Sequence, residues 1–103
     1  MKRIIGGKVY NTDTAERIAA EDKSLHNFFS TSEALYKTKK GAWFLHGESS
    51  AGGRYSHYSG KSCGYGQQII ALEIDEVLAW AENADINDEE KRRIADLIEI
   101  PEA

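Results

Sequence analysis

Residues 34–46 constrain the fold more than any other segment, because they place bulky side chains on both faces of one strand. Two β-prone stretches flank a short connection that holds two lysines and a glycine, a pattern typical of an antiparallel hairpin. In its second strand Trp43 and Leu45 point to one face, and Phe44 and His46 point to the other. We therefore expect a central strand that is covered on both sides.

Two further elements are expected before this hairpin. Gly6 and Gly7 separate two short apolar stretches, which favours a tight hairpin because a type I′ turn needs positive φ at both central positions. Thr12 or Asp13 is a suitable N-cap for a helix over 14–22. Its inward side chains are Ile18 and Ala19, and Leu25, beyond its end, is a further candidate for the same face.

The C-terminal part predicts one strand, over 67–72, and two helices. The first helix begins at Asp75, and Asn87 or Asp88 caps the second, which ends near Pro101. Apolar residues at helical spacing form one stripe on each helix: Ile74, Val77, Leu78 and Ala81 on the first, and Ile94, Leu97 and Ile98 on the second.

A chain of 103 residues is long enough for one compact core and too short for two ordinary domains. We expect a single α+β domain over 1–103. Its small antiparallel sheet has about five short strands, with one N-terminal and two C-terminal helices in the order ββαββ-loop-βαα.

The stretch 47–66 shows neither strand nor helix periodicity and is expected to be a long loop. It holds six of the nine glycines, three of the five tyrosines and five serines. This composition is typical of adaptable binding surfaces, so Arg54, Tyr55, Tyr58 and Tyr65 are candidate partner contacts. The alternative is a loop that folds over its own sheet.

A zinc site is a second interpretation of this stretch. The candidate ligands are His46, His57 and Cys63, with Glu48 or His26 as the fourth. The residue types suit tetrahedral zinc, although the spacing matches no standard finger or ribbon. Histidines that merely form hydrogen bonds are the alternative.

Enzyme motifs are not found. The sequence Gly60-Lys61-Ser62 lacks the earlier glycine of a phosphate-binding loop, since position 55 is tyrosine, and no helix is expected after it. His57 and Cys63 have no third group to orient them and no helix N-terminus to activate the thiol. We therefore expect a protein that is not an enzyme.

Charge is distributed unevenly along the chain. Residues 1–66 hold ten Lys/Arg and six Asp/Glu, and residues 67–103 hold three and eleven, so the two parts carry +4 and −8. An acidic region attracts a basic, nucleic-acid-binding partner by steering. The candidate carboxylates are Asp88, Glu89, Glu90 and Asp96. A solvated helix surface explains the same residues.

The expected compartment is the cytoplasm. Cys63 is the only cysteine, which fits a reducing environment. The basic start of the chain has no apolar segment of a signal peptide behind it. No apolar run reaches the length of about 20 residues that spans a bilayer, so no membrane contact is expected.

Two motifs carry a resemblance to known proteins: YNTDTA at 10–15 and LYKTKKGAWFLHGE at 35–48. With them the chain resembles a group of small accessory proteins carried by bacteriophages and integrative elements. Small acidic proteins of such mobile elements often disarm host defence, and anti-CRISPR proteins are the prominent case. The group offers no catalytic residues that can be assigned to positions in this sequence.

The resemblance implies a stoichiometric inhibitor of a host defence nuclease complex. Such a protein would dock on a Cas effector, whose basic channels hold nucleic acid. A small nucleic-acid-binding regulator is the alternative; it would use Arg54, Lys61 and the hairpin tip at 37–40. A zinc-stabilised interaction module is the third possibility.

Overall fold

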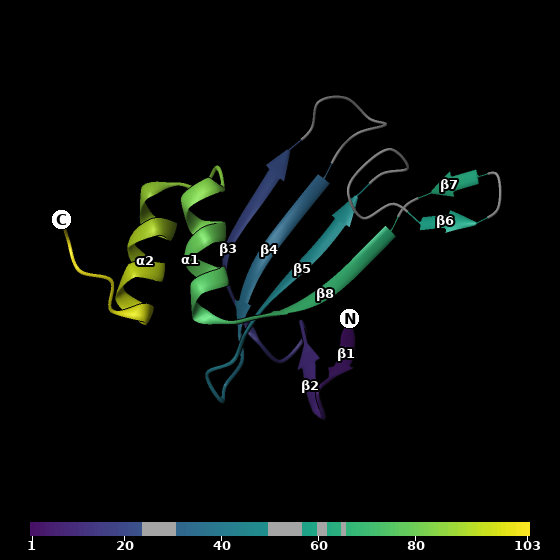
Figure 1. Ribbon diagram of the computed structural model, residues 1–103, viewed down its shortest axis with the longest axis horizontal. Helices are drawn as coiled ribbons and strands as arrows, with labels where there is room; N and C mark the ends of the chain where they lie inside the picture. The colour runs from purple at the N-terminus through teal and green to yellow at the C-terminus, as the bar shows by residue number, and fades with distance from the viewer. Residues whose placement is uncertain (24–30, 50–56, 60–61, 65) are drawn as a thin grey trace.

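Four antiparallel strands form the centre of the fold, in the spatial order β3-β4-β5-β8 (Figure 1). The computed structural model describes residues 1–23, 31–49, 57–59, 62–64 and 66–103. The four central strands are β3 (Glu16–Lys23), β4 (Thr31–Lys37), β5 (Trp43–Ser49) and β8 (Gly66–Leu72). The other described elements are the hairpin strands β1 (Lys2–Ile5), β2 (Lys8–Asn11), β6 (His57–Ser59) and β7 (Ser62–Gly64) and the helices α1 (Ile74–Asn83) and α2 (Asp88–Ile98).

Strand β5 is the central strand that its aromatic pattern predicts. It pairs with β4 on one side and with β8 on the other. Trp43 and Leu45 are buried in the core beneath the helices. Phe44 lies on the opposite face, where its ring stacks on Tyr36 with centroids 5.0 Å apart and meets the edge of Tyr10 at 5.6 Å. Both faces are therefore covered, as expected.

The helices cover one face of the sheet through a few buried residues. Val77 of α1 and Ile94 of α2 are almost completely buried, together with Ile86 from the connection between the helices. Asn87 caps α2, because its side chain accepts the N–H of Glu90 at 2.8 Å. The predicted stripes are thus confirmed at their centres, whereas Ile74 and Leu97 near the helix ends are exposed.

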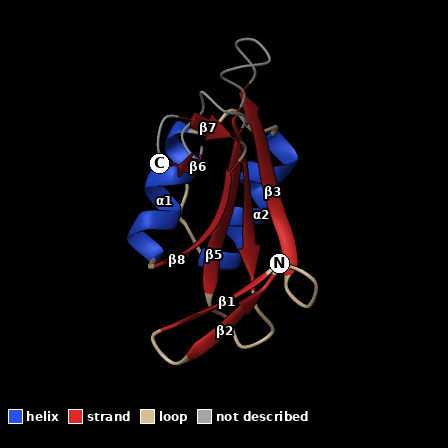
Figure 2. Cartoon of the chain, turned by 90° about the vertical axis from the view of Figure 1, so that its right-hand side faces the viewer, coloured by secondary structure: helices blue, strands red, loops and turns tan. Residues whose placement is uncertain are grey.

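The first hairpin, β1 with β2, covers the opposite face at one end of the sheet (Figure 2). Its turn has φ of 58° at Gly6 and 77° at Gly7. Positive φ at both positions is the geometry that the Gly-Gly pair predicts. Tyr10 and Ile5 pack from this hairpin onto Phe44 and Ile69.

The predicted helix over 14–22 is wrong, because residues 16–23 form strand β3. This strand pairs with β4 from Glu16 opposite Lys37 to Lys23 opposite Thr31. The residues before it form a turn rather than a helix cap: Asn11 Oδ1 accepts the N–H of Asp13 at 3.0 Å. Asn and Thr favour such turns for the same reason that they favour caps, since their side chains bond to nearby backbone.

Ile18 and Ala19 explain why residues 14–22 matched the apolar period of a helix. Both are buried, at 4% and 2% exposure, although neighbours on a regular strand point to opposite faces. A register shift between Arg17 and Ala19 marks a bulge at this point, and a bulge allows two successive residues to be buried on one strand. Two adjacent buried residues also fit a helix face, so the pattern favoured the wrong element.

The expectation of one unstructured loop over 47–66 is also corrected. Strand β5 continues to Ser49, β8 begins at Gly66, and β6 pairs with β7 with Tyr58 opposite Cys63. These strands are held together by backbone hydrogen bonds. Their glycines and serines have low strand preference, so the side-chain pattern did not predict them. The α+β class and the two C-terminal helices are confirmed, with eight strands in three sheets among the described residues instead of about five in one.

Both edges of the central sheet carry a side chain from a distant part of the chain. At the β3 edge the backbone N–H of Ala20 donates to Glu90 Oε2 at 2.8 Å. At the β8 edge Arg3 Nη1 donates to the carbonyl of Ile69 at 2.7 Å. These bonds satisfy polar edge groups that would otherwise be available to another strand.

Within the described ranges, neither helix has the length and apolar character needed to cross a membrane.

Candidate functional site

Carboxylates from strands and helices gather at one end of the sheet. Strands β3 and β5 end there, β4 begins there, and the connection from α1 to α2 lies beside the β3 edge at the same end (Figure 1). We call this surface the acidic end and define it by the following residues: Glu21, Asp22, Glu33, Glu48, Glu82, Asp85, Asp88 and Glu89.

Glu21 and Glu33 lie at the centre of the acidic end. They are directly opposite each other on β3 and β4, on the sheet face that the helices cover. Glu21 is only 5% exposed, and its Oε1 accepts the backbone N–H of Asp85 at 2.9 Å. Since a buried carboxylate is costly unless it is hydrogen-bonded, this contact also fixes the start of the acidic connection against β3.

A pocket of about 480 Å³ opens beside these two carboxylates. Its polar lining includes Glu21 and Glu33, and Trp80 forms part of its wall. Glu76 also lines it, but its Oε1 accepts the N–H of Glu73 at 2.9 Å in the cap of α1. Trp80 Nε1 donates to Glu33 Oε1 at 3.4 Å. Leu45, Ile70 and Leu72 supply apolar surface. An indole beside carboxylates is a favourable environment for a cationic side chain.

A second, smaller hollow lies on the other side of β3 and β4. Its volume is about 310 Å³, and its lining includes Asp22, Ser32, His46 and Glu48, with Arg17 as the cation. The Ser32 hydroxyl is hydrogen-bonded to the Asp22 carboxylate. Glu21 and Glu33 are among the residues that line this hollow as well, so the two depressions lie on either side of the same pair of strand residues.

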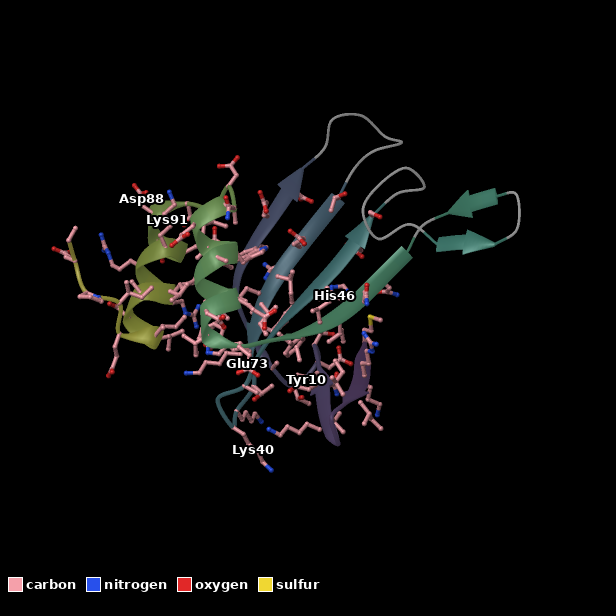
Figure 3. The ribbon with its side chains drawn as sticks, viewed as in Figure 1. Tyr10, Lys40, His46, Glu73, Asp88 and Lys91 are labelled. Carbon is pink, nitrogen blue, oxygen red and sulfur yellow. The ribbon has the colours of Figure 1, made fainter. Side chains whose placement is uncertain are left out.

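The four predicted carboxylates of α2 differ in position and in hydrogen bonding. Asp88 and Glu89 are exposed in the first turn (Figure 3), where carboxylates also stabilise the helix dipole. Glu90 is instead bonded within the chain, to the backbone N–H groups of Ala20 and Asn87. Asp96 lies two turns further along α2, away from the acidic end.

His46 lies on β5 on the face opposite the helices, and its Nε2 is 3.1 Å from Gln67 Oε1. An amide oxygen can only accept, so in this arrangement Nε2 carries the hydrogen and Nδ1 is the nitrogen that could bind a metal. No group of three possible metal ligands occurs among the residues that the structure describes. The zinc site therefore stays a prediction.

The other predicted residues of the 47–66 stretch are not brought into the acidic end by the described part of the structure. Arg54, Tyr55, Lys61 and Tyr65 lie outside the described residues, as does His26. His57, Tyr58 and Cys63 are placed by their backbones in β6 and β7. Their proposed roles stay predictions.

The sequence analysis missed Glu21, Glu33 and Trp80. Glu21 fell in the predicted helix, where a carboxylate would be expected on a solvated face. Glu33 precedes the predicted hairpin over 34–46, although β4 begins at Thr31. If residues 16–23 are assigned to a strand, Glu21 points to the face opposite Ala20. This alternation is the sequence signal that could have indicated its position.

No protein-family model matches the chain, and neither the curated proteins nor the solved structures contain a match. The structure itself defines a small α+β protein whose sheet carries helices on one face and a hairpin on the other. Its candidate site is a surface of carboxylates around a pocket that contains an indole.

Proposed function

We propose that this chain is a non-enzymatic binding protein that docks its acidic end on a basic, nucleic-acid-binding protein. One observation carries the proposal: Glu21 and Glu33, from two neighbouring strands, line one pocket together with Trp80 of α1. Carboxylates beside an aromatic wall suit an arginine or lysine side chain of a partner.

An arginine fits this arrangement better than a lysine. Its planar guanidinium can pair with a carboxylate through two hydrogen bonds and can stack on the face of an indole. The aliphatic part of the same side chain would pack on Leu45 and Ile70, which also line the pocket. A basic protein that presents an arginine therefore has a specific point of attachment.

The carboxylates around the pocket would guide the partner and fix its orientation. Glu82, Asp85, Asp88 and Glu89 are exposed and lie within eight residues of one another. Such rim charges mainly raise the association rate and favour partners of opposite charge. An ordinary interface buries about 800 Å² per partner, which is a modest share of this chain's 7089 Å² surface.

The resemblance of residues 10–15 and 35–48 to proteins of mobile elements supports a more particular form of this function. The chain would be a stoichiometric, anti-CRISPR-like inhibitor whose acidic end occupies a basic channel of a Cas effector. Arg54, Tyr55, Tyr58 and Tyr65 of the 47–66 stretch would add further contacts. Inhibition of this type requires tight binding and no turnover.

The test uses purified, guide-loaded Cas nucleases and a DNA cleavage assay. We expect wild-type protein to abolish cleavage by a susceptible nuclease near one equivalent. The variant D85K/D88K/E89K should bind at least about tenfold more weakly, because interfacial charge reversal is costly. The matched control, D13K/E99K/E102K, changes the net charge equally at exposed carboxylates outside the acidic end and should inhibit like wild type.

Two outcomes would contradict the proposal. Equal weakening by both triple variants would indicate a general effect of net charge and would remove the acidic end from the interface. Inhibition far below one equivalent, with turnover of a substrate that a single side-chain change abolishes, would show that the chain is an enzyme. Unchanged circular dichroism confirms that each variant is folded.

A further inference from the structure

The end of the sheet opposite the acidic end carries a groove lined by lysines. Two pockets of about 520 and 530 Å³ lie at the β4–β5 turn, and both are lined by Thr14, Thr38, Lys39 and Lys40. Lys8 of the β1–β2 hairpin also lines the first pocket, and Lys37 also lines the second. We call the two pockets together the basic groove.

The β4–β5 turn presents its lysines in a defined geometry. Thr38 accepts the N–H of Gly41 through its carbonyl at 3.0 Å and the N–H of Ala42 through Oγ1 at 3.0 Å. Gly41 has φ of 91°, which closes the turn. Lys39 and Lys40 are therefore held at the exposed tip, and Figure 3 shows Lys40 at this end of the molecule.

The lining of the groove offers hydrogen-bond donors as well as charge. Thr38 Oγ1 uses a lone pair to accept from Ala42, so its hydroxyl hydrogen can be donated to an anion. Among the described residues, the pocket that contacts Lys8 has no carboxylate in its lining. The other pocket includes Glu16, but Glu16 forms an ion pair with Arg93.

We propose that the basic groove binds the phosphate backbone of a nucleic acid strand. Lysines and hydroxyl groups are the usual protein contacts to phosphate. The lysines come from three sites, Lys8, Lys37 and the Lys39-Lys40 pair, and they line two pockets that have four lining residues in common. This arrangement suits a chain of phosphates better than a single phosphate ion. A concave surface also suits a strand better than a flat lipid surface.

The carboxylates of the acidic end do not prevent this binding. The strands that separate the two ends, β4 and β5, have seven residues each, or about 23 Å at about 3.3 Å per residue. The Debye length is about 8 Å at physiological ionic strength, so the acidic end is largely screened from a strand in the basic groove. This inference does not rest on the proposed docking of the acidic end.

The experiment measures binding of the full chain to a fluorescently labelled 20-nucleotide single strand by anisotropy, over a series of salt concentrations. The variant K8E/K40E removes two lysines of the groove. Its matched control, K91E/R92E, makes the same change of net charge on exposed residues of α2, where Figure 3 shows Lys91 far from Lys40.

We expect the wild-type chain to bind with an affinity that falls as salt rises. Each phosphate contact on a single strand contributes about 0.7 to the slope of log affinity against log salt. K8E/K40E should therefore reduce that slope by about 1.4 and weaken binding about tenfold at low salt. K91E/R92E should keep the wild-type slope, and D85K/D88K/E89K should bind the strand at least as well as wild type.

Three results would overturn the inference. The wild-type chain could fail to bind the strand even at low salt. The two double variants could lose affinity equally, which would indicate net charge rather than the groove. The chain could instead bind vesicles with anionic lipids and not the strand, which would assign the lysines to a membrane surface.

Discussion

The backbone N–H of Ala20 donates a hydrogen bond to the carboxylate of Glu90 at 2.8 Å, across 70 positions of sequence. The same carboxylate caps α2 through the N–H of Asn87 at 3.4 Å. One side chain thus joins the edge of the sheet to the start of the last helix. This contact also shields the β3 edge from pairing with another strand.

Replacement of Glu90 should therefore destabilise the fold more than replacement of its neighbours. In E90A the cap contact is lost, and the N–H of Ala20 is left without its acceptor. We expect a loss of about 2–3 kcal/mol in the free energy of unfolding, measured by urea denaturation. E89A removes an exposed carboxylate from the same turn and should change stability by less than about 0.5 kcal/mol. Equal effects would contradict this role of Glu90.

At the opposite edge, Arg3 should matter more than Lys2. Arg3 donates to the Ile69 carbonyl from the β1–β2 hairpin, and R3M would leave that carbonyl without this donor. The expected loss is about 1–2 kcal/mol, together with faster hydrogen exchange in β8. K2M changes an exposed side chain of the same strand and should leave both measurements near wild type. Unchanged exchange in R3M would show that the bond does not hold the hairpin to the sheet.

The packing of α2 depends on Ile94 and not on Leu97. Ile94 is 1% exposed, whereas Leu97 is 38% exposed. I94A should cost about 2–5 kcal/mol, because it leaves a cavity between the helix and the sheet. L97A removes a similar volume from a surface position and should cost well under half as much. Thermal and urea unfolding of both variants would test this difference, and similar values would mean that α2 packs differently.

Trp80 offers an optical test of the pocket at the acidic end. An arginine-rich peptide that enters the pocket should change the indole emission of the wild-type chain, because a cation would lie against Trp80. In W80F the remaining indole, Trp43, is buried beneath the helices, and its emission should not respond. A glutamate-rich peptide of equal length is the control. A response that survives in W80F would place the cation elsewhere.

Much of the fold could be predicted wherever local geometry decides it. The turn at Gly6-Gly7 needs positive φ, and glycine provides it without strain. The cap at Asn87 and the turn between β4 and β5 also depend on residues close together in sequence. Trp43 and Phe44 also predicted that β5 is covered on both faces, because bulky side chains that point to both faces of a strand need a packed layer on each.

Residues 16–23 show where prediction failed. Their alanines and glutamates suit a helix, and Ile18 and Ala19 supplied an apparent helix face. Pairing with β4 overrode this local preference, and the bulge that buries both residues is visible only in the paired strand. The candidate site was missed for the same reason, because Glu21 faces Glu33 only when both segments are strands.

The sequence by itself determined the class of the fold, the two C-terminal helices, the first and central hairpins and the uneven distribution of charge. These features depend on the period of apolar side chains and on the φ preferences of single residues. Only the tertiary structure decided that carboxylates from β3, β4 and the helices meet at one end and that the lysines of two separate turns meet at the other. Contacts between residues that are distant in sequence depend on which strands pair and in what register. The sequence of one strand does not determine its partner or its register.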